Sequence, residues 1–370
     1  MLTWRAGTVA ALGPSWGGER GAVQLTVRLS EPDAGAAVPA LAYPGVVGHP
    51  QVGDRVLLNT RALDDGLGTG GYALVVALPD RLPDPAAGPG HLVKQRYSPL
   101  QQTVAGADEQ GSPWHSQLRD ADDLAGLPVV VADLHSALPA VVAGIRAVAP
   151  TLRVGYVMTD GGALPLAVSR TVAALREAGW LISTVTTGQS WGGDLEAVSV
   201  HSGLLAARIA GAVDVVVLTQ GPGNLGTGTR WGFSGVVAGE AVNAAALLQG
   251  RPVAALRVSA TDPRVRHRGV SHHSLTAYGR VALAAADVVV PVLTGGLAGF
   301  GELIRGQARP LAARHRLIEV ATDGLAEAIA TSPVAVSSMD RDYQADPACF
   351  LASAAAGRHA ANLAQAAATP

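Results

Sequence analysis

The chain has 370 residues, of which 48% are hydrophobic and 15% are charged, and its formal net charge is -2. This length predicts two domains, or one large domain with an appendage, because domains average roughly 150 residues. The apolar content excludes a disordered chain, and the charge balance argues against a nucleic-acid carrier, since excess Lys and Arg normally hold phosphate backbones.

The chain also carries few signals of an oxidising or membrane environment. Its lone cysteine, Cys349, excludes an intramolecular disulfide, CxxC redox chemistry and a cysteine-rich zinc site. Residues 1–30 contain four charged residues and lack the apolar segment of a signal peptide. The most apolar stretch, residues 281–300, contains Asp287 and Pro291, which favours a helix end and a buried strand over a membrane span. We therefore expect a cytoplasmic protein without a membrane partner.

Residues 1–80 consist of apolar runs separated by Gly and Pro turns. Between residues 22 and 29, apolar side chains alternate with polar ones, which is the period-2 pattern of a strand with one buried face. Four strands are predicted, at residues 7–12, 22–29, 54–59 and 72–78. We interpret residues 1–80 as a small antiparallel β-barrel-like domain.

Residues 81–125 are rich in Pro, Gly, Gln and Asp and show no sustained periodicity, so we interpret them as a linker or excursion. Lys94, Arg96 and Tyr97 lie within this segment. They belong either to a solvated connector or to a flap that folds over a neighbouring pocket. Lys94 is the only lysine, which we interpret as codon bias in a GC-rich bacterial genome.

After residue 126, short β-branched runs alternate with helical stretches. The runs are nearly continuous in apolar character, as expected for parallel strands buried on both faces. They lie at residues 129–133, 154–159, 182–187, 215–219, 253–258, 288–293 and 317–321. Residues 164–177 and 194–210 are long enough for crossover helices. We predict a Rossmann-like α/β domain over residues 126–345, with a doubly wound, mainly parallel sheet.

Residues 346–370 are Ala-rich and predict a C-terminal helix and tail. This helix would either cap the sheet or pair with another subunit. Because apolar faces left open in one subunit tend to be buried between subunits, the aliphatic surplus favours a homodimer.

Ligands of open parallel sheets bind outside the carboxyl ends of the strands, near the point where the winding reverses. Polar or Gly-rich segments follow six of the predicted strands, beginning with His135 after the first and Asp160 after the second. Any one of these segments is ordinary turn chemistry, because Gly, Asp and Ser populate turns and helix caps. Their conjunction predicts one functional pocket at this rim.

The loop at residues 221–229 contains a GxGxxG match formed by Gly221, Gly223 and Gly226. A Rossmann turn enters its helix at this motif, whereas residues 227–232 delay any helix here, and the expected acidic residue of the next strand is missing. A nicotinamide cofactor is therefore disfavoured. We interpret the loop as a cradle for an anion, whose hydroxyls and flexible backbone come from Thr227, Gly228 and Thr229. The structural alternative is a glycine-rich turn that packs against a helix.

Residues 262–273 form the densest cationic segment of the chain. Guanidinium groups hold phosphate or carboxylate through paired hydrogen bonds, and neutral histidine acts as a base or a metal ligand. The candidate ligand-binding and catalytic residues of the segment are Asp262, Arg264, Arg266, His267, Arg268, His272 and His273. A solvated basic loop is the alternative for the arginines, whereas the paired histidines open a predicted helix.

The segment at residues 188–196 is the third candidate loop. Asp194 is interpreted as a helix N-cap, with Glu196 in the first turn and His201 on nearly the same helical face. Alternatively, Asp194 serves as a general base or a metal ligand. Gly188 and Gly193 complete the loop.

The rim residues also contain enough oxygen and nitrogen ligands for a divalent metal ion, although no spacing such as HExxH identifies one. The candidate ligands are Asp160, Asp194, Asp262, His135, His272 and His273.

Three motifs resemble those of a bacterial family described only as a domain of unknown function. They are residues 187–197, residues 221–229 and the segment from Arg266 to His273. The resemblance extends over most of the chain, including the barrel-like start. It implies a bacterial cytosolic protein and assigns no catalyst.

We expect an enzyme of the transferase or hydrolase type that acts on a small anionic, phosphorylated or nucleotide-like metabolite. The 221–229 loop and the arginines of residues 264–268 would bind the anion, and His272 or His273 would transfer protons. Asp160 and Asp194 would orient the substrate or a metal. The alternatives are a non-catalytic metabolite sensor and an interaction or scaffold protein.

Overall fold

The computed structural model describes residues 2–30, 34–66, 71–83, 88 and 90–368. Its contacts divide the chain into two compact units. The first consists of Met1–Gly88 with Ala167–Ala174, and the second consists of Pro89–Leu166 with Leu175–Pro370. The segment that the sequence presents as a linker thus belongs, from residue 89 onward, to the second unit.

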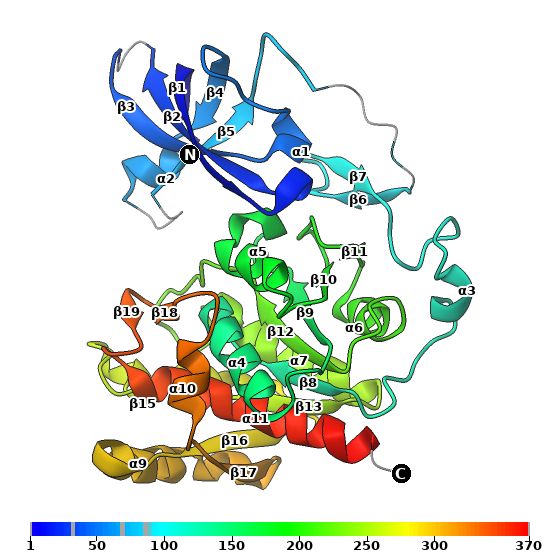
Figure 1. Cartoon of the computed structure of the whole chain (residues 1–370), viewed down its shortest axis with the longest axis vertical. Coiled ribbons are helices and arrows are strands. Elements are labelled where there is room, and N and C mark those ends of the chain that lie inside the picture. The colour runs from blue at the N-terminus through cyan, green and yellow to red at the C-terminus, as the bar shows by residue number, and fades with distance from the viewer. Residues whose placement is uncertain (1, 31–33, 67–70, 84–87, 89, 369–370) are drawn as a thin grey trace. The chain divides into compact units, whose positions relative to one another are not determined.

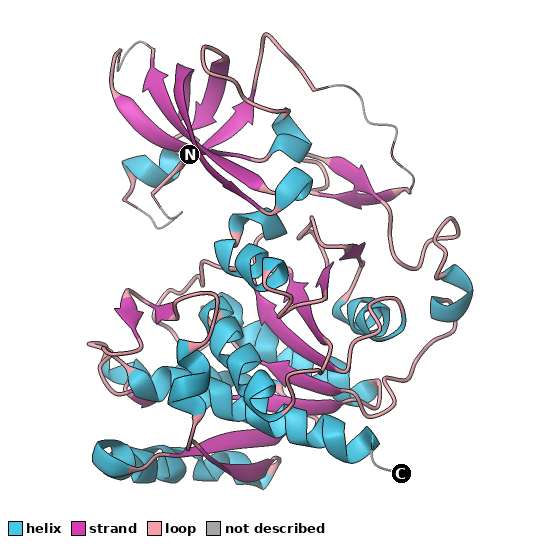
Figure 2. Ribbon diagram, viewed as in Figure 1, coloured by secondary structure: helices cyan, strands magenta, loops and turns pink. Residues whose placement is uncertain are grey.

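The first unit contains a closed five-stranded barrel in the order β1-β2-β3-β5-β4 (Figures 1 and 2). Its strands are β1 (Trp4–Trp16), β2 (Ala22–Leu29), β3 (Ala37–Ala42), β4 (Arg55–Asn59) and β5 (Ala73–Ala77). The short helices α1 (Pro44–Val47) and α2 (Arg61–Asp64) join them. The barrel is confirmed, but its pairing is not purely antiparallel, because β3 and β5 run parallel.

The alternation in β2 fixes which side chains fill the barrel. Leu25, Val27 and Leu29 are buried, whereas Thr26 and Arg28 are exposed. The sequence prediction lacked β3, whose short apolar run contains Pro39. Proline cannot donate to a ladder and therefore weakens a strand prediction, yet β3 pairs with β2 over six residues.

The second unit is built on an eight-stranded sheet in the order β11-β10-β9-β12-β8-β13-β16-β17. All neighbouring strands run parallel. The strands are β8 (Pro128–Val131), β9 (Val154–Thr159), β10 (Ser183–Thr186), β11 (Leu195–Glu196), β12 (Val215–Gln220), β13 (Arg251–Ala255), β16 (Asp287–Val292) and β17 (Arg316–Ala321). All seven predicted runs are strands, and the predicted parallel α/β fold is confirmed.

Helices cover both faces of this sheet. The described helices after residue 126 are α4 (Leu138–Val148), α5 (Arg170–Glu177), α6 (Val200–Ile209), α7 (Val237–Leu247), α8 (His272–Thr276), α9 (Ala298–Ala308), α10 (Leu325–Ala330) and α11 (Pro347–Ala368). Of these, α4, α6, α7, α9 and α11 pack on the sheet, whereas most of α5 belongs to the first unit. In Figure 1, α11 lies alongside α4 and crosses the sheet, where it packs on β8, β13 and β16. Helices α6 and α7 pack on each other, and α7 contacts β8, β12 and β13.

The position at which the winding reverses follows from the strand order. The connection from β8 through α4 to β9 and the connection from β12 through α7 to β13 run in opposite directions along the sheet. Because parallel crossovers are right-handed, α4 and α7 lie on opposite faces. The reversal therefore lies between the adjacent strands β8 and β12, which is where ligands of such sheets bind.

Two helix predictions need correction. The segment predicted as the start of a helix at residues 194–196 forms β11 instead, and α6 begins after its N-cap Ser199. The Asp194 carboxylate accepts hydrogen bonds from the backbone and hydroxyl of Thr184 in β10, both at 2.9 Å, which ties this segment to the sheet edge. Asp194 is thus no helix N-cap and shares no helical face with His201. The helix predicted at residues 164–177 also begins later, with α5.

Residues 90–125 contain β6 (Leu92–Lys94), β7 (Gln102–Val104) and α3 (His115–Leu118). Strands β6 and β7 form an antiparallel pair. Tyr97 is exposed, whereas Lys94 is fully buried, so this part of the expected connector contributes to the interior of the second unit.

The apolar stretch at residues 281–300 spans the end of a π-helical turn (Ala277–Val281), β16 and the start of α9. Asp287 is buried in β16 and binds Arg316 at 2.6 Å and His359 of α11 at 2.8 Å. Among the described residues, no helix has both the length and the apolar character needed to span a bilayer.

Candidate functional site

Three strand ends at the winding reversal place polar side chains in the interior. Asp133 follows β8, Gln220 ends β12, and Arg257 follows β13. All three side chains are at least nine-tenths buried. Gln220 Nε2 donates a 2.8 Å hydrogen bond to the backbone oxygen of Asp133, which fixes the start of the loop after β8.

Asp133, Arg257 and His273 form the centre of this cluster. Arg257 Nη1 lies 3.2 Å from His273 Nδ1 and 3.9 Å from Asp133 Oδ2. His273 Nδ1 lies 3.6 Å from the same carboxylate oxygen. Asp133 Oδ2 is buried and finds no hydrogen-bond partner in the described part of the chain. The cluster therefore holds a carboxylate, a guanidinium and an imidazole in contact, and one carboxylate oxygen makes these long ion-pair contacts without a hydrogen bond.

His273, one of the two histidines predicted as catalytic, is held in place by the elements around a small hairpin. Strands β14 (Val258–Ser259) and β15 (Gly269–Val270) pair antiparallel, which returns the chain to the end of β13. Helix α8 then begins after Ser271, whose hydroxyl accepts a 3.2 Å hydrogen bond from the backbone of His273. Ser274 Oγ accepts a 2.9 Å hydrogen bond from the Arg257 backbone, so α8 and the end of β13 are locked together.

His267, His272 and His273 pack against one another. Their ring centroids are 4.4–4.9 Å apart, and Phe233 stacks on His273 at 3.9 Å with an interplanar angle of 4°. One ring nitrogen from each histidine lies within 4.8 Å of the others. His272 Nε2 is buried without a hydrogen-bond partner among the described residues.

The surroundings keep two of these imidazoles neutral. Burial, and next the positive charge of Arg257, lowers the pKa of His267 to about 3. Burial, and next the neighbouring His273, lowers the pKa of His272 to about 4. Both rings are therefore unprotonated near pH 7, the form that acts as a base or as a metal ligand.

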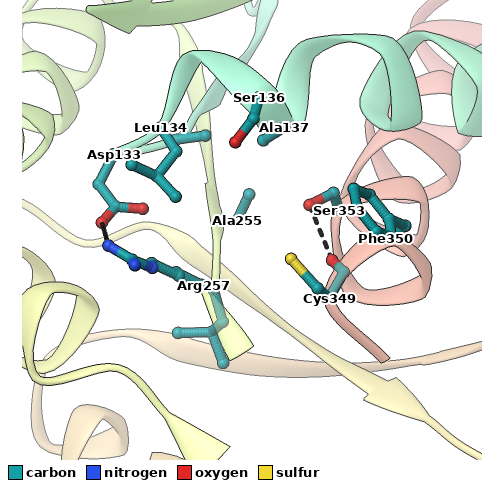
Figure 3. Close-up of a pocket in the computed structure, with 11 residues that line it drawn as sticks. Asp133, Leu134, Ser136, Ala137, Ala255, Arg257, Cys349, Phe350 and Ser353 are labelled. Carbon is teal, nitrogen blue, oxygen red and sulfur yellow. Dashed lines mark hydrogen bonds and ion pairs between the residues drawn. The ribbon is translucent and has the colours of Figure 1, made fainter. Parts of the chain in front are cut away.

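Asp133 and Arg257 also line a small pocket (Figure 3). Its other lining residues follow β8, lie in the 3₁₀ turn His135–Ala137 before α4 or at the end of β13, or belong to the first turns of α11. Cys349 lies at this pocket, and burial, followed by the charge of Asp346, raises the pKa of its thiol to about 12. The thiolate form needed for nucleophilic chemistry is therefore scarce at neutral pH.

His135 lies beside this cluster in a hydrogen-bonded chain. Its Nδ1 is 3.0 Å from Tyr156 Oη, which in turn lies 2.9 Å from Thr219 Oγ1. Burial lowers the pKa of His135 to about 4. The ring is thus neutral near pH 7, and its Nδ1 already has a partner.

Most of the predicted anion-binding arginines have other partners. Asp262 is fully buried and accepts from Arg264 at 2.8 Å and from Arg341 at 3.0 Å. Arg268 is exposed and donates a long bond, 3.4 Å, to the Asp262 backbone. Arg266 is exposed and makes no ion pair within the described residues, which leaves it the guanidinium best placed for a ligand.

The glycine-rich loop is an exposed turn that connects β12 to α7. Gly226 bridges to Phe233, and Thr227 N donates to the Gly232 oxygen at 2.7 Å. The hydroxyls of Thr227 and Thr229 contact each other at 3.1 Å. Residues 221–236 separate the strand from the helix, so the loop lacks the Rossmann geometry. A Cβ on Gly228 would lie 4.0 Å from Arg266 Nη2, which places this loop beside the basic segment.

The remaining predicted residues form separate clusters near the β11 edge of the sheet. The Asp160 carboxylate accepts from the backbone of Ala163 and of Gln189, both at 2.9 Å, and a Cβ on Gly188 would meet it. Asp194 pairs with Arg176. Four strand spacings of about 4.8 Å separate β11 from β8, or roughly 19 Å. Asp194 and Glu196 are therefore too distant to share a reacting atom with Asp133.

Glu196 has a structural partner that the sequence did not reveal. Lys94 Nζ lies 3.3 Å from Glu196 Oε2 and donates to the backbone oxygens of Ser190 at 2.9 Å and Ala197 at 3.0 Å. Glu196 also accepts from Thr186 Oγ1 at 2.6 Å. The pair holds the chain around Gly193, which predicts a structural role for this loop.

Sequence reasoning missed Asp133, Gln220 and Arg257. Each is a polar residue at or just beyond the carboxyl end of an otherwise apolar strand. That position was itself a usable signal, because an ionisable residue at the end of a doubly buried strand points into the rim where ligands bind.

A family model described as "Protein of unknown function (DUF3866)" matches residues 39–357 of the chain. The matched range includes the whole cluster around Asp133 and begins within β3, so β1 and β2 precede it. No curated protein matches the chain. The resemblance indicated by the three motifs is thereby confirmed.

Proposed function

The chain belongs to this family of unknown function, and we propose that it is an enzyme that transfers or hydrolyses a group on a small anionic metabolite. The observation that carries the proposal is the presence, at the winding reversal, of two buried polar atoms without a hydrogen bond in the part of the chain that the structure describes. They are His272 Nε2 and Asp133 Oδ2, and the second makes long ion-pair contacts, 3.9 Å to Arg257 and 3.6 Å to His273.

Unpaired buried polar atoms cost stability. A buried donor or acceptor without a partner costs about 1–3 kcal/mol, and folded proteins keep few of them. Both atoms are accounted for when a ligand binds beside the buried Arg257, provided that the ligand carries an O–H or N–H donor for Asp133 Oδ2 as well as its anionic group. Their position at a topological switch point supports the same interpretation.

The residue types suit group transfer better than redox chemistry. Arg257 and Arg266 are guanidinium groups, which bind phosphate or carboxylate through paired hydrogen bonds. His272 is neutral near pH 7 and can accept a proton from a nucleophile. Asp133 faces Arg257 and His273 and would orient both. The proposal does not use Asp160, Asp194 or Glu196, because their carboxylates are already hydrogen-bonded elsewhere.

The proposal is tested in two stages on the full-length protein. A thermal-shift screen of phosphate esters, nucleotides and carboxylates identifies a stabilising compound, and NMR of that compound with the protein then measures turnover. We expect Arg266→Ser to weaken binding roughly tenfold or more, the loss expected for a charge-assisted hydrogen bond. Arg280→Ser is the matched control, because Arg280 is also exposed and lies outside the cluster.

His272→Gln separates catalysis from binding. We expect it to abolish turnover while the compound still stabilises the protein. Unchanged turnover in this variant would contradict the assignment of His272 as the base. Tight binding without turnover by the wild-type protein would contradict an enzyme and favour a metabolite sensor.

A further inference from the structure

We propose that His267, His272 and His273 bind one divalent transition-metal ion of the zinc type, with Asp133 as the residue that positions His273. One nitrogen from each ring lies within 4.8 Å of the others. Zinc–nitrogen bonds of about 2.0–2.1 Å in a tetrahedral site place the nitrogens about 3.3 Å apart. The site would therefore close when side-chain rotations bring these nitrogens together by up to about 1.5 Å.

Among the described residues, the free ring nitrogens of His272 and His267 indicate that these histidines bind a metal rather than fill the core. A core histidine normally satisfies both ring nitrogens, yet His272 Nε2 is buried without a partner in the described part of the chain. His267 uses Nδ1, at 2.7 Å from Ser271 Oγ, which leaves its Nε2 for a ligand. This division of the two nitrogens is typical of metal-binding histidines, whose second nitrogen is held by an outer partner.

Asp133 provides the outer partner of His273. Arg257 can only donate, so its contact with His273 Nδ1 at 3.2 Å requires the proton of a neutral His273 to lie on Nε2. A metal bound at Nε2 would require that proton on Nδ1. Because two N–H donors cannot share the 3.2 Å contact with Arg257, the ring would turn so that Nδ1 donates to Asp133 Oδ2, now 3.6 Å away. Asp133 Oδ2, which has no hydrogen bond to any residue that the structure describes, would thus accept the Nδ1 proton of a metal-bound His273.

The ligand chemistry selects the class of metal. Three imidazole ligands with an open fourth position match catalytic zinc sites, whereas Mg²⁺ and Ca²⁺ prefer oxygen ligands. The positive charges of Arg257 and Arg266 disfavour the binding of a second metal ion. The negative charge of Asp133 offsets one of these two positive charges. The loaded site would be strongly positive and open to an anion. This inference rests on the anion-binding part of the proposed function and changes the role of His272, because an imidazole nitrogen bound to a metal cannot also accept a proton. With the metal bound, His272 would be a ligand and the ion would supply the activation of the nucleophile. The test of the metal site needs no substrate.

Metal binding is measured on the full-length protein after treatment with a chelator. Calorimetric titration with Zn²⁺ and the visible absorption of added Co²⁺ report stoichiometry and ligand geometry. We expect one ion per chain in the wild-type protein. His267→Gln and His272→Gln should each weaken Zn²⁺ binding by more than the roughly 10–100-fold that loss of an outer partner costs, and Asp133→Asn should weaken it within that range.

His201→Gln is the control, because His201 is exposed on α6 and lies outside the cluster. Its titration should match that of the wild-type protein, and circular dichroism establishes that each variant is folded. Folded wild-type protein that binds no Zn²⁺, or full binding by both His267→Gln and His272→Gln, would overturn the metal site. Anion binding without Zn²⁺ binding would contradict the metal site and leave the proposed function standing. Zn²⁺ binding without turnover of any anionic compound would support the metal site and contradict the proposed enzyme.

Discussion

Lys94 is the only lysine of the chain, and its side chain is fully buried. Burial lowers the pKa of Lys94 and raises that of Glu196, while the ion pair between them acts in the opposite direction on both. Backbone oxygens and Glu196 together surround the ammonium group. Removing one partner of such a pair leaves the other buried and uncompensated, which is far costlier than losing a surface ion pair.

We expect Lys94→Met to lower the free energy of unfolding by about 3–5 kcal/mol, the cost of breaking a buried pair. Urea denaturation followed by circular dichroism measures the loss. Arg96→Met is the matched control, because Arg96 is exposed two residues away and its replacement should change stability by at most about 0.5 kcal/mol. The double variant Lys94→Met, Glu196→Met should recover part of the loss. Equal stabilities of Lys94→Met and Arg96→Met would contradict the structural role.

At the residue scale, the sequence predicted contacts between functional residues that lie close together in the chain. It failed to predict contacts between residues that are far apart in the chain. The dense cationic segment at residues 262–273 placed His267, His272 and His273 among its candidate residues, and the three histidines do lie together. His267 was not among the metal ligands that the sequence suggested. Lys94 and Glu196 are 102 positions apart, and no local pattern connects them. Asp133 and Arg257 each stand alone in sequence and meet only because β8 and β13 are neighbours.

Helices α4 and α11 approach each other at two glycines. A Cβ on Gly144 of α4 would lie 1.9 Å from the backbone oxygen of Ala354, and one on Gly357 of α11 would lie 1.9 Å from that of Val141. The Ala-rich composition of α11 permits the same close approach along the rest of the contact. Through this contact, α11 covers the sheet within its own chain.

We expect Gly144→Ala to destabilise the second unit by about 1–3 kcal/mol or more, because the added methyl group has no space and the helices must separate. Gly306→Ala in α9 is the control. Nothing lies within 4 Å of its added Cβ, and alanine is a better helix former than glycine by about 0.5–1 kcal/mol, so this variant should be slightly stabilised. Thermal unfolding of both variants compares the two positions. A Gly144→Ala protein as stable as the wild type would rule out the close contact.

At the element scale, the sequence predicted the strands whose burial gives them a regular apolar pattern and missed the strands that lack such a pattern. The seven apolar β-branched runs are strands because both faces of the sheet are covered, and a doubly buried strand has a nearly continuous apolar sequence. The two-residue strand β11 has no such pattern. It forms because Asp194 and Glu196 bond to Thr184 and Thr186 of β10, which is a tertiary contact. Strand β3 was missed for a similar reason. Pro39 disfavours a strand locally, but pairing with β2 in the closed barrel outweighs that preference.

At the scale of the whole molecule, two hydrophobic cores exist in one chain. The barrel core is formed by residues such as Leu25, Val27 and Leu58, whereas the second core lies between the parallel sheet and its helices. A unit with its own core can unfold as its own cooperative step. The candidate site draws every one of its residues from the second unit.

This separation predicts how damage to the barrel core affects the molecule. Leu25 is 1% exposed, and Leu25→Ala should cost about 2–5 kcal/mol of barrel stability through the cavity that it creates. Scanning calorimetry should then show an earlier barrel transition beside an unchanged second transition, and Zn²⁺ titration should match that of the wild-type protein. Leu218→Ala, at an equally buried position in β12, should instead lower the transition of the second unit. A single transition that shifts as a whole in both variants would show that the two cores unfold together, and the barrel would then support the stability of the site.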